Sequence, residues 1–295
     1  IDQHPSSNRM LPASINPNAL ENPSHTPLTQ TAGCPAGMIA YWEMEETTPG
    51  VYVDSFGEHD AVCTGEECPV DENGILGGGQ YFSAAKAFVA ADPAFDFGVN
   101  DSFTFEYWMK GVSGTTCNLG NEAVLARVSS SNSLHIWTGC SRNIGVIKTR
   151  FTLTDNDGNT VEMNGPTNPA DGNWHHIVAT RDSVLDMNYL YVDGDQEVVA
   201  SNTYNAEFSS LSDGITIGHR FFYSADYFFT GTIDEVAIYN IALTEAQITD
   251  HYNAGVGKKY CDFSTTAPPQ ITSTPITSGQ LNLPYSYDVE ATGNP

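Results

Sequence analysis

Short runs in which apolar and polar residues alternate recur along the middle of the chain, and they constrain the fold more than any other feature of the sequence. In FTFEYWMKG, three aromatic residues, Phe103, Phe105 and Tyr107, occupy every second position. This period places one set of side chains on each face of a β-strand. Many short strands separated by turns predict an all-β sandwich of the jelly-roll type. Further strand-like runs occupy residues 173–182, 188–201, 214–218 and 231–240.

Two turn signals and one helix signal complete the predicted domain. The Asp-Gly pair at 193–194 separates two apolar runs, as in a tight hairpin. DNDGN, residues 155–159, lacks the closing glutamate of an EF-hand loop, so we interpret it as a second hairpin turn. The segment 244–255 predicts one short helix, because Thr244 and Gln247 have the spacing of a capping box and a glycine C-cap closes the segment.

Composition divides the chain into four parts. Residues 1–36 are rich in Pro, Asn, Ser and Thr and have no strand or helix period, so we expect an extended tail. The β-rich part covers 37–261, and a Ser/Thr/Pro linker covers 262–272. Residues 273–295 alternate again, like the first strands of another β domain.

The charge of the chain limits its partners. The 295 residues include 36 Asp and Glu against 11 Lys and Arg, a formal net charge of −25. Such a surface repels phosphate backbones and anionic lipids and attracts divalent cations, so we expect no nucleic acid partner. No apolar run approaches the roughly 20 residues of a membrane span, so we expect no membrane insertion.

The chain has six cysteines, and none of them has the spacing of a zinc site. An even number without metal spacing predicts three disulfides and an oxidising, extracellular location. The count leaves several connectivities open. We favour Cys63–Cys68 around a tight loop, Cys117–Cys140 across a hairpin, and Cys34–Cys261 across the two ends of the β-rich part.

Two acidic residues stand side by side inside an apolar strand pattern, GTIDEVAIYN at 231–240. If the strand alternates regularly, Asp234 shares the face of Val236 and Ile238. A carboxylate on the core face is costly unless it is paired, hydrogen-bonded or bound to a metal. We therefore expect Asp234 to face a metal ion or, alternatively, a set of backbone N–H groups.

Six motifs follow one another between residues 37 and 255: MIAYWEMEE, VDSFGEHDAVCTG, SFTFEYWMK, NWHHIVATRD, LYVDGDQ and FTGTIDEVAIYNIALTEAQI. In content and order they resemble the LamG-like domains, the laminin G type of concanavalin A-like jelly rolls in secreted and surface proteins. The resemblance implies a jelly-roll β-sandwich with one short C-terminal helix. The segment PPQITSTPITSGQLNLPYSYDVEATGNP is similar to the start of a bacterial Ig-like repeat.

The resemblance also implies a structural Ca²⁺ at one edge of the sandwich. Its ligands in the family come from a loop after the first strand and from the aspartate of the GxIDEV strand, here Asp54 and Asp234. Calcium takes six to eight oxygen ligands, mixing carboxylates with carbonyls. The loop VDSFGEHDA can add the carbonyls of Gly57 and His59 and the carboxylate of Asp60.

One pair of carboxylates raises the question of catalysis. Glu43 and Glu45 in WEMEE share a strand face, as do the two acids of β-sandwich glycoside hydrolases. The surrounding pattern is that of the family's first strand, and carboxylates are common on solvated strand faces. We therefore expect a protein that is not an enzyme.

Aromatic residues suggest a ligand surface. Trp42, Trp108 and Trp174 lie in family strand motifs and are predicted core residues. Trp137 lies outside these motifs, and with Tyr223 and Tyr227 it is a candidate platform for a sugar ring or a protein partner.

Two functions are consistent with these features. The first is a secreted, calcium-stabilised structural or adhesive surface protein, whose tail packs on a neighbouring copy and builds a homo-oligomer or filament. The tail is equally able to fold back on its own sandwich. The alternative function is a carbohydrate-binding module of a larger extracellular enzyme, with a glycan as the partner.

Overall fold

A computed structural model of the chain describes residues 33–117, 120–128, 135–208, 214–222, 225–261, 270–271 and 291–292. The predicted tail lies outside these residues except for its last four positions, as does nearly all of the predicted linker. Of the segment that resembles an Ig-like repeat, only β19 (Gln270–Ile271) and β20 (Ala291–Thr292) are described, and they pair with each other.

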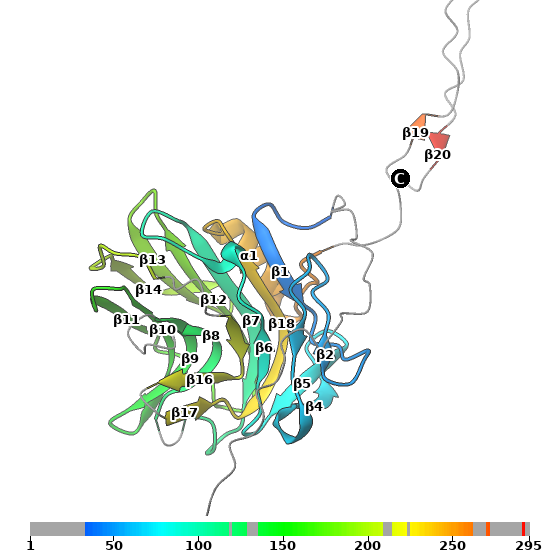
Figure 1. The fold of residues 1–295 in the computed structure, drawn as a ribbon, viewed down its shortest axis with the longest axis horizontal. Helices are drawn as coiled ribbons and strands as arrows, with labels where there is room; N and C mark the ends of the chain where they lie inside the picture. The colour runs from blue at the N-terminus through cyan, green and yellow to red at the C-terminus, as the bar shows by residue number, and fades with distance from the viewer. Residues whose placement is uncertain are drawn as a thin grey trace, which may run out of the picture.

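The β-rich part forms two sheets, which we call sheet I and sheet II (Figure 1). Sheet I has eight strands, in the order β14-β13-β12-β7-β18-β5-β4, and β1 also pairs with β18. Its strands are β1 (Met38–Trp42), β4 (Val70–Asn73), β5 (Gly78–Phe82), β7 (Phe103–Gly111), β12 (Trp174–Asp182), β13 (Met187–Val192), β14 (Asp195–Ser201) and β18 (Gly231–Tyr239).

Sheet II has ten strands, in the order β11-β10-β9-β8-β15-β6-β3-β2, with β16 and β17 attached through β8. All its pairs are antiparallel except β17 with β8. Its strands are β2 (Val51–Tyr52), β3 (Ala61–Val62), β6 (Ala87–Val89), β8 (Glu122–Val128), β9 (His135–Asn143), β10 (Val146–Thr154), β11 (Thr160–Asn164), β15 (Ile215–Ile217), β16 (His219–Phe222) and β17 (Ala225–Phe228).

The main core lies between the two sheets. Alternate residues of β7 from one sheet, such as Phe103 and Phe105, meet Leu125, Ile136 and Phe151 from the other. This arrangement confirms the predicted jelly-roll sandwich. Of the tryptophans predicted for the core, Trp42 and Trp108 are buried, but Trp174 is only half-buried.

A second apolar cluster lies on the other face of sheet I. Helix α1 (Glu245–Tyr252) and the segment ending at Cys261 cover this face, where Ile248 packs with Tyr239 and Tyr260 (Figure 1). Both faces of β7 and β18 are therefore buried, except at Lys110 near the end of β7, which is half-buried.

The helix begins as predicted and ends earlier. Thr244 and Gln247 form the capping box, with each side chain bonded to the other residue's backbone N–H. The helix ends at Asn253, which adopts the left-handed conformation with φ 49°, so Gly255 is not the C-cap. Asparagine tolerates this conformation because its short side chain forms local hydrogen bonds, here to the Gly257 carbonyl.

Three disulfides join the same cysteine pairs that we favoured, Cys34–Cys261, Cys63–Cys68 and Cys117–Cys140. The first closes a sequence separation of 227 residues and brings the two ends of the sandwich together. Within the described part of the chain, no helix is long and apolar enough to cross a membrane.

A charged group lies inside the second cluster. Glu106 of β7 is fully buried, and its Oε1 lies 2.8 Å from His176 Nε2 and 3.0 Å from His251 Nδ1 of α1. Burial opposes the charge of Glu106, but the two histidines outweigh it and lower its pKa to about 2. Burial also lowers the pKa of His251, yet the Glu106 carboxylate outweighs burial and holds that pKa above its usual value.

The first prediction concerns this contact between α1 and sheet I. A histidine whose pKa is raised in the folded state stabilises it fully below the unfolded pKa of about 6.5, and loses that contribution as the pH rises through the folded value. We expect His251→Gln to lower the free energy of unfolding more at pH ~5.5 than at pH ~8.5. Urea unfolding of both proteins at the two pH values measures this.

The matched control is Glu106→Gln, which removes the charge that holds the proton. In that background burial still opposes the charge of His251, so His251→Gln should no longer cost more stability at pH ~5.5 than at pH ~8.5. An effect of His251→Gln that is independent of pH in the native background would contradict the assignment.

Candidate functional site

Strand β18, which carries the adjacent acids, changes partner in its middle. On one side it pairs with β7 over most of its length. On the other side Gly231–Ile233 pair with β5, whereas Val236–Tyr239 pair with β1. At the change the register with β7 shifts, and Glu235 has a φ of 49°. These are the features of a β-bulge.

The bulge overturns the alternation assumed from the sequence. Ile233 and Val236 both belong to the main core, although three positions separate them. Asp234 is paired with Trp108, which lies outside the main core and packs against His176. Asp234 is therefore buried, as expected, but on the face opposite to Val236.

The carboxylate of Asp234 accepts hydrogen bonds from the turn that joins β4 to β5. Its Oδ2 lies 2.8 Å from the Ile75 nitrogen and 3.1 Å from the Leu76 nitrogen, and its Oδ1 lies 3.0 Å from the Glu235 nitrogen. A Cβ on Gly74 would lie 2.3 Å from Oδ2, so only glycine allows this approach. The structure thus provides the N–H groups that were the alternative to a metal.

Burial changes the acidity of both neighbours. It raises the pKa of Asp234 to about 7, although the N–H groups of Leu76, Ile75 and Glu235 oppose the rise. Burial and the charge of Asp234 raise the pKa of Glu235 to about 9. The Tyr41 hydroxyl donates a hydrogen bond to Glu235 Oε2. Glu235 is therefore mostly protonated at neutral pH.

The other predicted calcium ligands lie together in the loop after β2. Asp54 Oδ1 accepts hydrogen bonds from the nitrogens of Tyr41 and Phe56 at 2.8 and 3.0 Å. Its Oδ2 lies 3.1 Å from the His59 nitrogen, and an Asp60 carboxylate oxygen accepts from the Asp54 nitrogen at 2.9 Å.

The structure does not bring Asp54 and Asp234 side by side. Trp42 of β1 pairs with Val236 on one side and with Asp54 on the other, so β1 separates the two carboxylates. In the described ranges, one group of three ligand atoms is close enough for a single ion, and two of its members, Cys117 and Cys140, are joined in a disulfide. The five predicted ligands do not fit one shared ion in this arrangement.

The possible catalytic pair is held by a lysine. Lys259 forms an ion pair with Glu43, and its Nζ lies 3.7 Å from Glu45 Oε1. The Ser55 hydroxyl donates to Glu43 at 3.0 Å. These contacts tie the segment before Cys261 to the end of β1.

The predicted aromatic platform is not open. Trp137 has a relative exposure of 1%, and the guanidinium carbon of Arg220 lies 4.2 Å from the centre of its ring. Arg220 also lies 4.9 Å from the ring of Tyr227, which is half-buried. Tyr223 lies outside the described residues. Trp137 is therefore a buried residue beneath arginine, because cation–π contact with Arg220 offsets the cost of covering both groups.

The sequence analysis missed the basic residues around Trp137. Lys148 and Arg150 of β10 and Arg220 of β16 lie on or over the outer face of sheet II. A signal was present in the sequence, since residues 141–154 include three of the 11 basic residues and no acid.

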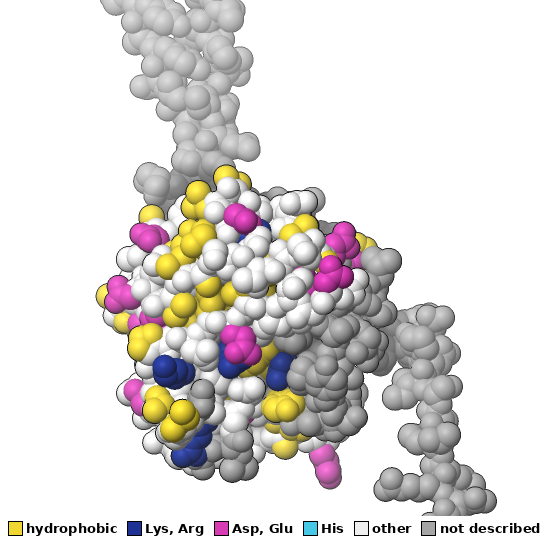
Figure 2. Space-filling view, turned by 90° about the vertical axis from the view of Figure 1, so that its left-hand side faces the viewer, with side chains coloured by type: hydrophobic (Ala, Val, Ile, Leu, Met, Phe, Trp, Pro, Cys, Tyr) yellow, Lys and Arg dark blue, Asp and Glu magenta, His cyan; other side chains and the backbone are white. Residues whose placement is uncertain are grey.

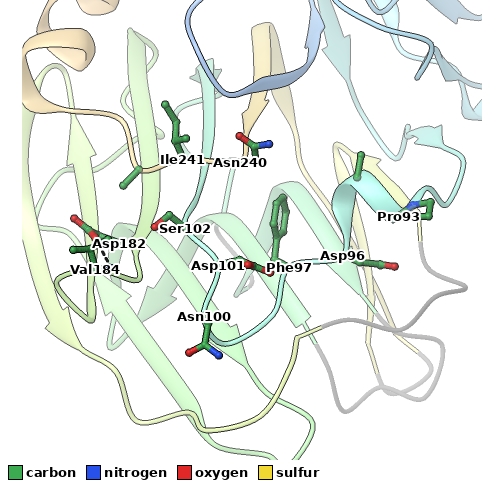
Figure 3. Close-up of a pocket in the computed structure, with 12 residues that line it drawn as sticks. Pro93, Asp96, Phe97, Asn100, Asp101, Ser102, Asp182, Val184, Asn240 and Ile241 are labelled. Carbon is green, nitrogen blue, oxygen red and sulfur yellow. Dashed lines mark hydrogen bonds between the residues drawn. The ribbon is translucent and has the colours of Figure 1, made fainter.

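A pocket of about 730 Å³ lies at one end of the sandwich (Figure 3). Three segments meet around it: the loop before β7, the turn after β12, and the segment after β18. Its lining combines carboxylates, amides and a hydroxyl with apolar side chains. The residues are Pro93, Ala94, Asp96, Phe97, Asn100, Asp101, Ser102, Asp182, Val184, Asn240, Ile241 and Ala242.

A family model described as the concanavalin A-like lectin/glucanases superfamily matches residues 77–249, more than half of the chain. The chain belongs to this superfamily. A search of curated proteins finds no match.

Solved structures of this lectin-like fold are similar to the chain. The binding domain of Paraclostridial Mosquitocidal Protein 1 has a TM-score of 0.57 and 16% identity, over 74% of this chain and 52% of that one. The botulinum neurotoxin serotype G binding domain has a TM-score of 0.56 and 14% identity, over 74% and 51%. This lectin-like chain thus spans about half the length of the toxin domains.

A third similar structure is matched over nearly its whole length. Domain 4 of AbnA, a GH43 extracellular arabinanase from Geobacillus stearothermophilus in complex with arabinotriose, has a TM-score of 0.52 and 17% identity. The match covers 74% of this chain and 98% of that domain. At these identities the likenesses establish the lectin-like fold alone.

The second prediction tests Asp234 as the acceptor that holds the β4–β5 turn. Asp234→Ala leaves three N–H groups without their acceptor, and an unsatisfied buried donor costs about 1–3 kcal/mol. We expect the variant to lose about 2–4 kcal/mol of unfolding free energy. Asp234→Asn keeps an acceptor oxygen and should lose less. Chemical denaturation measures both.

Asp157→Ala, at an exposed aspartate in the turn between β10 and β11, is the control and should have little effect. Equal stability of Asp234→Ala and the control would show that the turn does not depend on Asp234.

Proposed function

We propose that the chain is a non-catalytic carbohydrate-binding module and that the pocket in Figure 3 binds a neutral glycan. The observation that carries this proposal is the composition of the pocket, in which planar polar groups stand beside apolar ones. Its size is within the usual range for ligand pockets, roughly 300–1,000 Å³. The arabinotriose complex of the AbnA domain supports this proposal, as do the other binding domains of the same fold.

The polar groups of the pocket suit hydroxyl groups. Asp101 and Asp182 already accept backbone N–H bonds, which fix their carboxylates, and Asp96 is held by Arg127. Fixed carboxylates are strong acceptors for sugar hydroxyls and lose little side-chain entropy on binding. Asn240 is exposed and offers both a donor and an acceptor.

The charge and the apolar walls narrow the ligand class. Three aspartates line the pocket, so they repel acidic sugars, and a neutral glycan is the better match. Val184, which is exposed, and Ile241, which is half-buried, supply apolar surface for the C–H face of a sugar ring. Figure 3 shows Asn240 and Ile241 on one side of the pocket and Phe97 and Asp101 on another.

The third prediction tests the glycan pocket. Titration calorimetry with a panel of neutral oligosaccharides that includes arabinotriose should find at least one ligand. Asn240→Ala should weaken that ligand about fivefold to tenfold, the usual effect of losing one or two hydrogen bonds. Asn73→Ala, at an exposed asparagine of β4 away from the pocket, should bind like the native protein.

Failure of the whole panel at millimolar concentration would sink the pocket proposal. Equal weakening by Asn240→Ala and Asn73→Ala would place the ligand elsewhere. Hydrolysis of any oligosaccharide in the panel would overturn the non-catalytic part of the proposal.

We further propose that the protein is secreted, which its three disulfides support. The adhesive role and the homo-oligomer or filament built through residues 1–36 stay predictions, because nearly all of that segment lies outside the described residues. Glycan binding at the pocket is compatible with a single chain and with a homo-oligomer or filament.

Calcium stabilisation also stays a proposal of this article, and we assign it to the loop after β2. Asp54 and Asp60 lie together there, and Gly57 approaches Asp54 Oδ2 closely. The carbonyl of His59 accepts a hydrogen bond from the Trp42 indole at 2.8 Å and keeps a lone pair for an ion.

The fourth prediction separates the two predicted calcium ligands. We expect Ca²⁺ to raise the melting temperature over that measured with a chelator, because an ion that binds the folded state alone adds about 2.7 kcal/mol at 100 times its Kd. Asp54→Asn should abolish the difference, and Asp234→Asn should keep it. Loss of the difference in both variants would indicate an ion shared by both residues, and no difference in the native protein would refute the proposal.

A further inference from the structure

Basic side chains gather on one part of a chain that is otherwise strongly acidic. Figure 2 shows several of them on the lower part of one face, with an acidic side chain among them. Lys148, Arg150 and Arg220 lie on or over the outer face of sheet II, and Glu162 lies beside them. The whole chain has a formal net charge of −25. Among the described residues, Lys148 and Arg150 outnumber Glu162 on this face, so the charge there is opposite in sign to that of the whole chain.

The register of the strands places these residues on one surface. Cross-strand neighbours share a face of the sheet, and two rows cross β8, β9, β10 and β11. One row is Ala126, Trp137, Thr152 and Glu162, and the next is Ala123, Gly139, Arg150 and Asn164. Lys148 pairs with Ser141 in the following row. Trp137 packs with Ala123 and Ala126 away from the main core, so this face is the outer one.

The face already holds a carboxylate. Arg150 forms an ion pair with Glu162, whose side chain is 53% exposed, and its Nε lies 3.0 Å from the Thr152 hydroxyl. These two contacts hold the Arg150 guanidinium in one orientation. Glu162 lies between it and solvent, and the carboxylate of a ligand is able to take the place of the Glu162 carboxylate. Burial lowers the pKa of Arg220 to about 10, and the charge of Arg150 adds to this effect.

Neutral hydrogen-bonding groups surround the charges. The Ser141 hydroxyl donates to Asn164 Oδ1 at 3.0 Å, and Asn164 is exposed at the end of β11. The exposed Asn164 amide is a typical partner for the hydroxyls of a sugar ring. The short rows also limit the size of the positive area. A stiff polyanion of high charge density would extend beyond this area and be repelled by the acidic rest of the surface. A sugar chain with one carboxylate per residue is able to contact this area alone.

We propose that the outer face of sheet II, around Lys148 and Arg150, binds an acidic polysaccharide whose negative groups are the carboxylates of uronic acid residues. Arg150 and Lys148 take the carboxylates of neighbouring sugar residues, and Asn164 takes hydroxyls. This face shares no residue with the pocket of Figure 3, so it is a second site with a different charge preference.

Binding to polygalacturonate measured by calorimetry at low ionic strength tests the proposal. We expect binding by the native chain that weakens as salt rises from about 0.05 to about 0.5 M, because screening shortens the range of the attraction. Fully methyl-esterified polygalacturonate, which has the same backbone without the charge, should bind at least about tenfold more weakly.

Variants locate the site. Lys148→Glu should weaken binding about fivefold or more, and Glu162→Gln should strengthen it about twofold to threefold, because it frees Arg150 from its partner. Lys258→Glu, at an exposed lysine paired with Asp250 near α1, changes the net charge as much as Lys148→Glu and should have less than about a twofold effect. Circular dichroism checks that all three fold.

Each other outcome counts against the proposal. Equal effects of Lys148→Glu and Lys258→Glu would indicate a response to net charge only. Equal or tighter binding of dextran sulfate or double-stranded DNA would replace uronate recognition with a general affinity for polyanions. Weaker binding by Glu162→Gln would remove Arg150 from the site. Asn240→Ala should leave polygalacturonate binding unchanged. The proposal for the pocket and the proposal for this face can therefore be refuted separately.

Discussion

The change of partner in β18 is the constraint on which the rest of sheet I depends. Between its pairing with β5 and its pairing with β1, the strand has two residues whose outer side faces no strand. Asp234 supplies acceptors for the turn before β5, and Glu235 accepts from Tyr41 of β1. A strand that switches neighbours leaves backbone groups unpaired unless side chains replace the missing ladder. The two acids that first looked misplaced are these replacements.

Much of the fold could be predicted from local patterns, because most strands alternate regularly and their turns use the expected residues. β7 begins and ends where its pattern does, and the Asp193-Gly194 turn joins β13 to β14 with both residues at positive φ. The face of Asp234 could not be predicted in this way. Alternation assumes a continuous ladder, whereas the register with β7 shifts at Glu235 and Asp234 bonds to Ile75, 159 residues earlier in the sequence. The alternation of apolar and polar residues along one strand contains no information about such distant contacts.

The burial of the aromatic residue Trp137 likewise could not be predicted from local sequence patterns. Trp137 has no core motif around it, so the sequence favoured an exposed ring, yet the side chain is buried. What covers it is an arginine from β16, some 80 residues further along the chain. Two alanines of β8 cover part of the ring and a cation–π contact covers another part, and hydrophobic patterning does not register a cation–π contact. The clustering of basic residues in 141–154 was the readable signal, because charge is informative where it departs from the rest of the chain.

In the two proposed sites, charge distinguishes two kinds of ligand. The pocket at the end of the sandwich is lined by three aspartates, two of them fixed by backbone N–H groups and one by Arg127, which suits hydroxyls and repels acids. The outer face of sheet II carries arginine and lysine in register, which suits acids. A strongly acidic protein repels a polyanion over most of its surface. Cationic side chains overcome that repulsion only for groups that lie within a screening length of about 10 Å. The net charge of the chain therefore sharpens the selectivity of the basic face, since it restricts productive encounters to ligands small or flexible enough to contact that face alone.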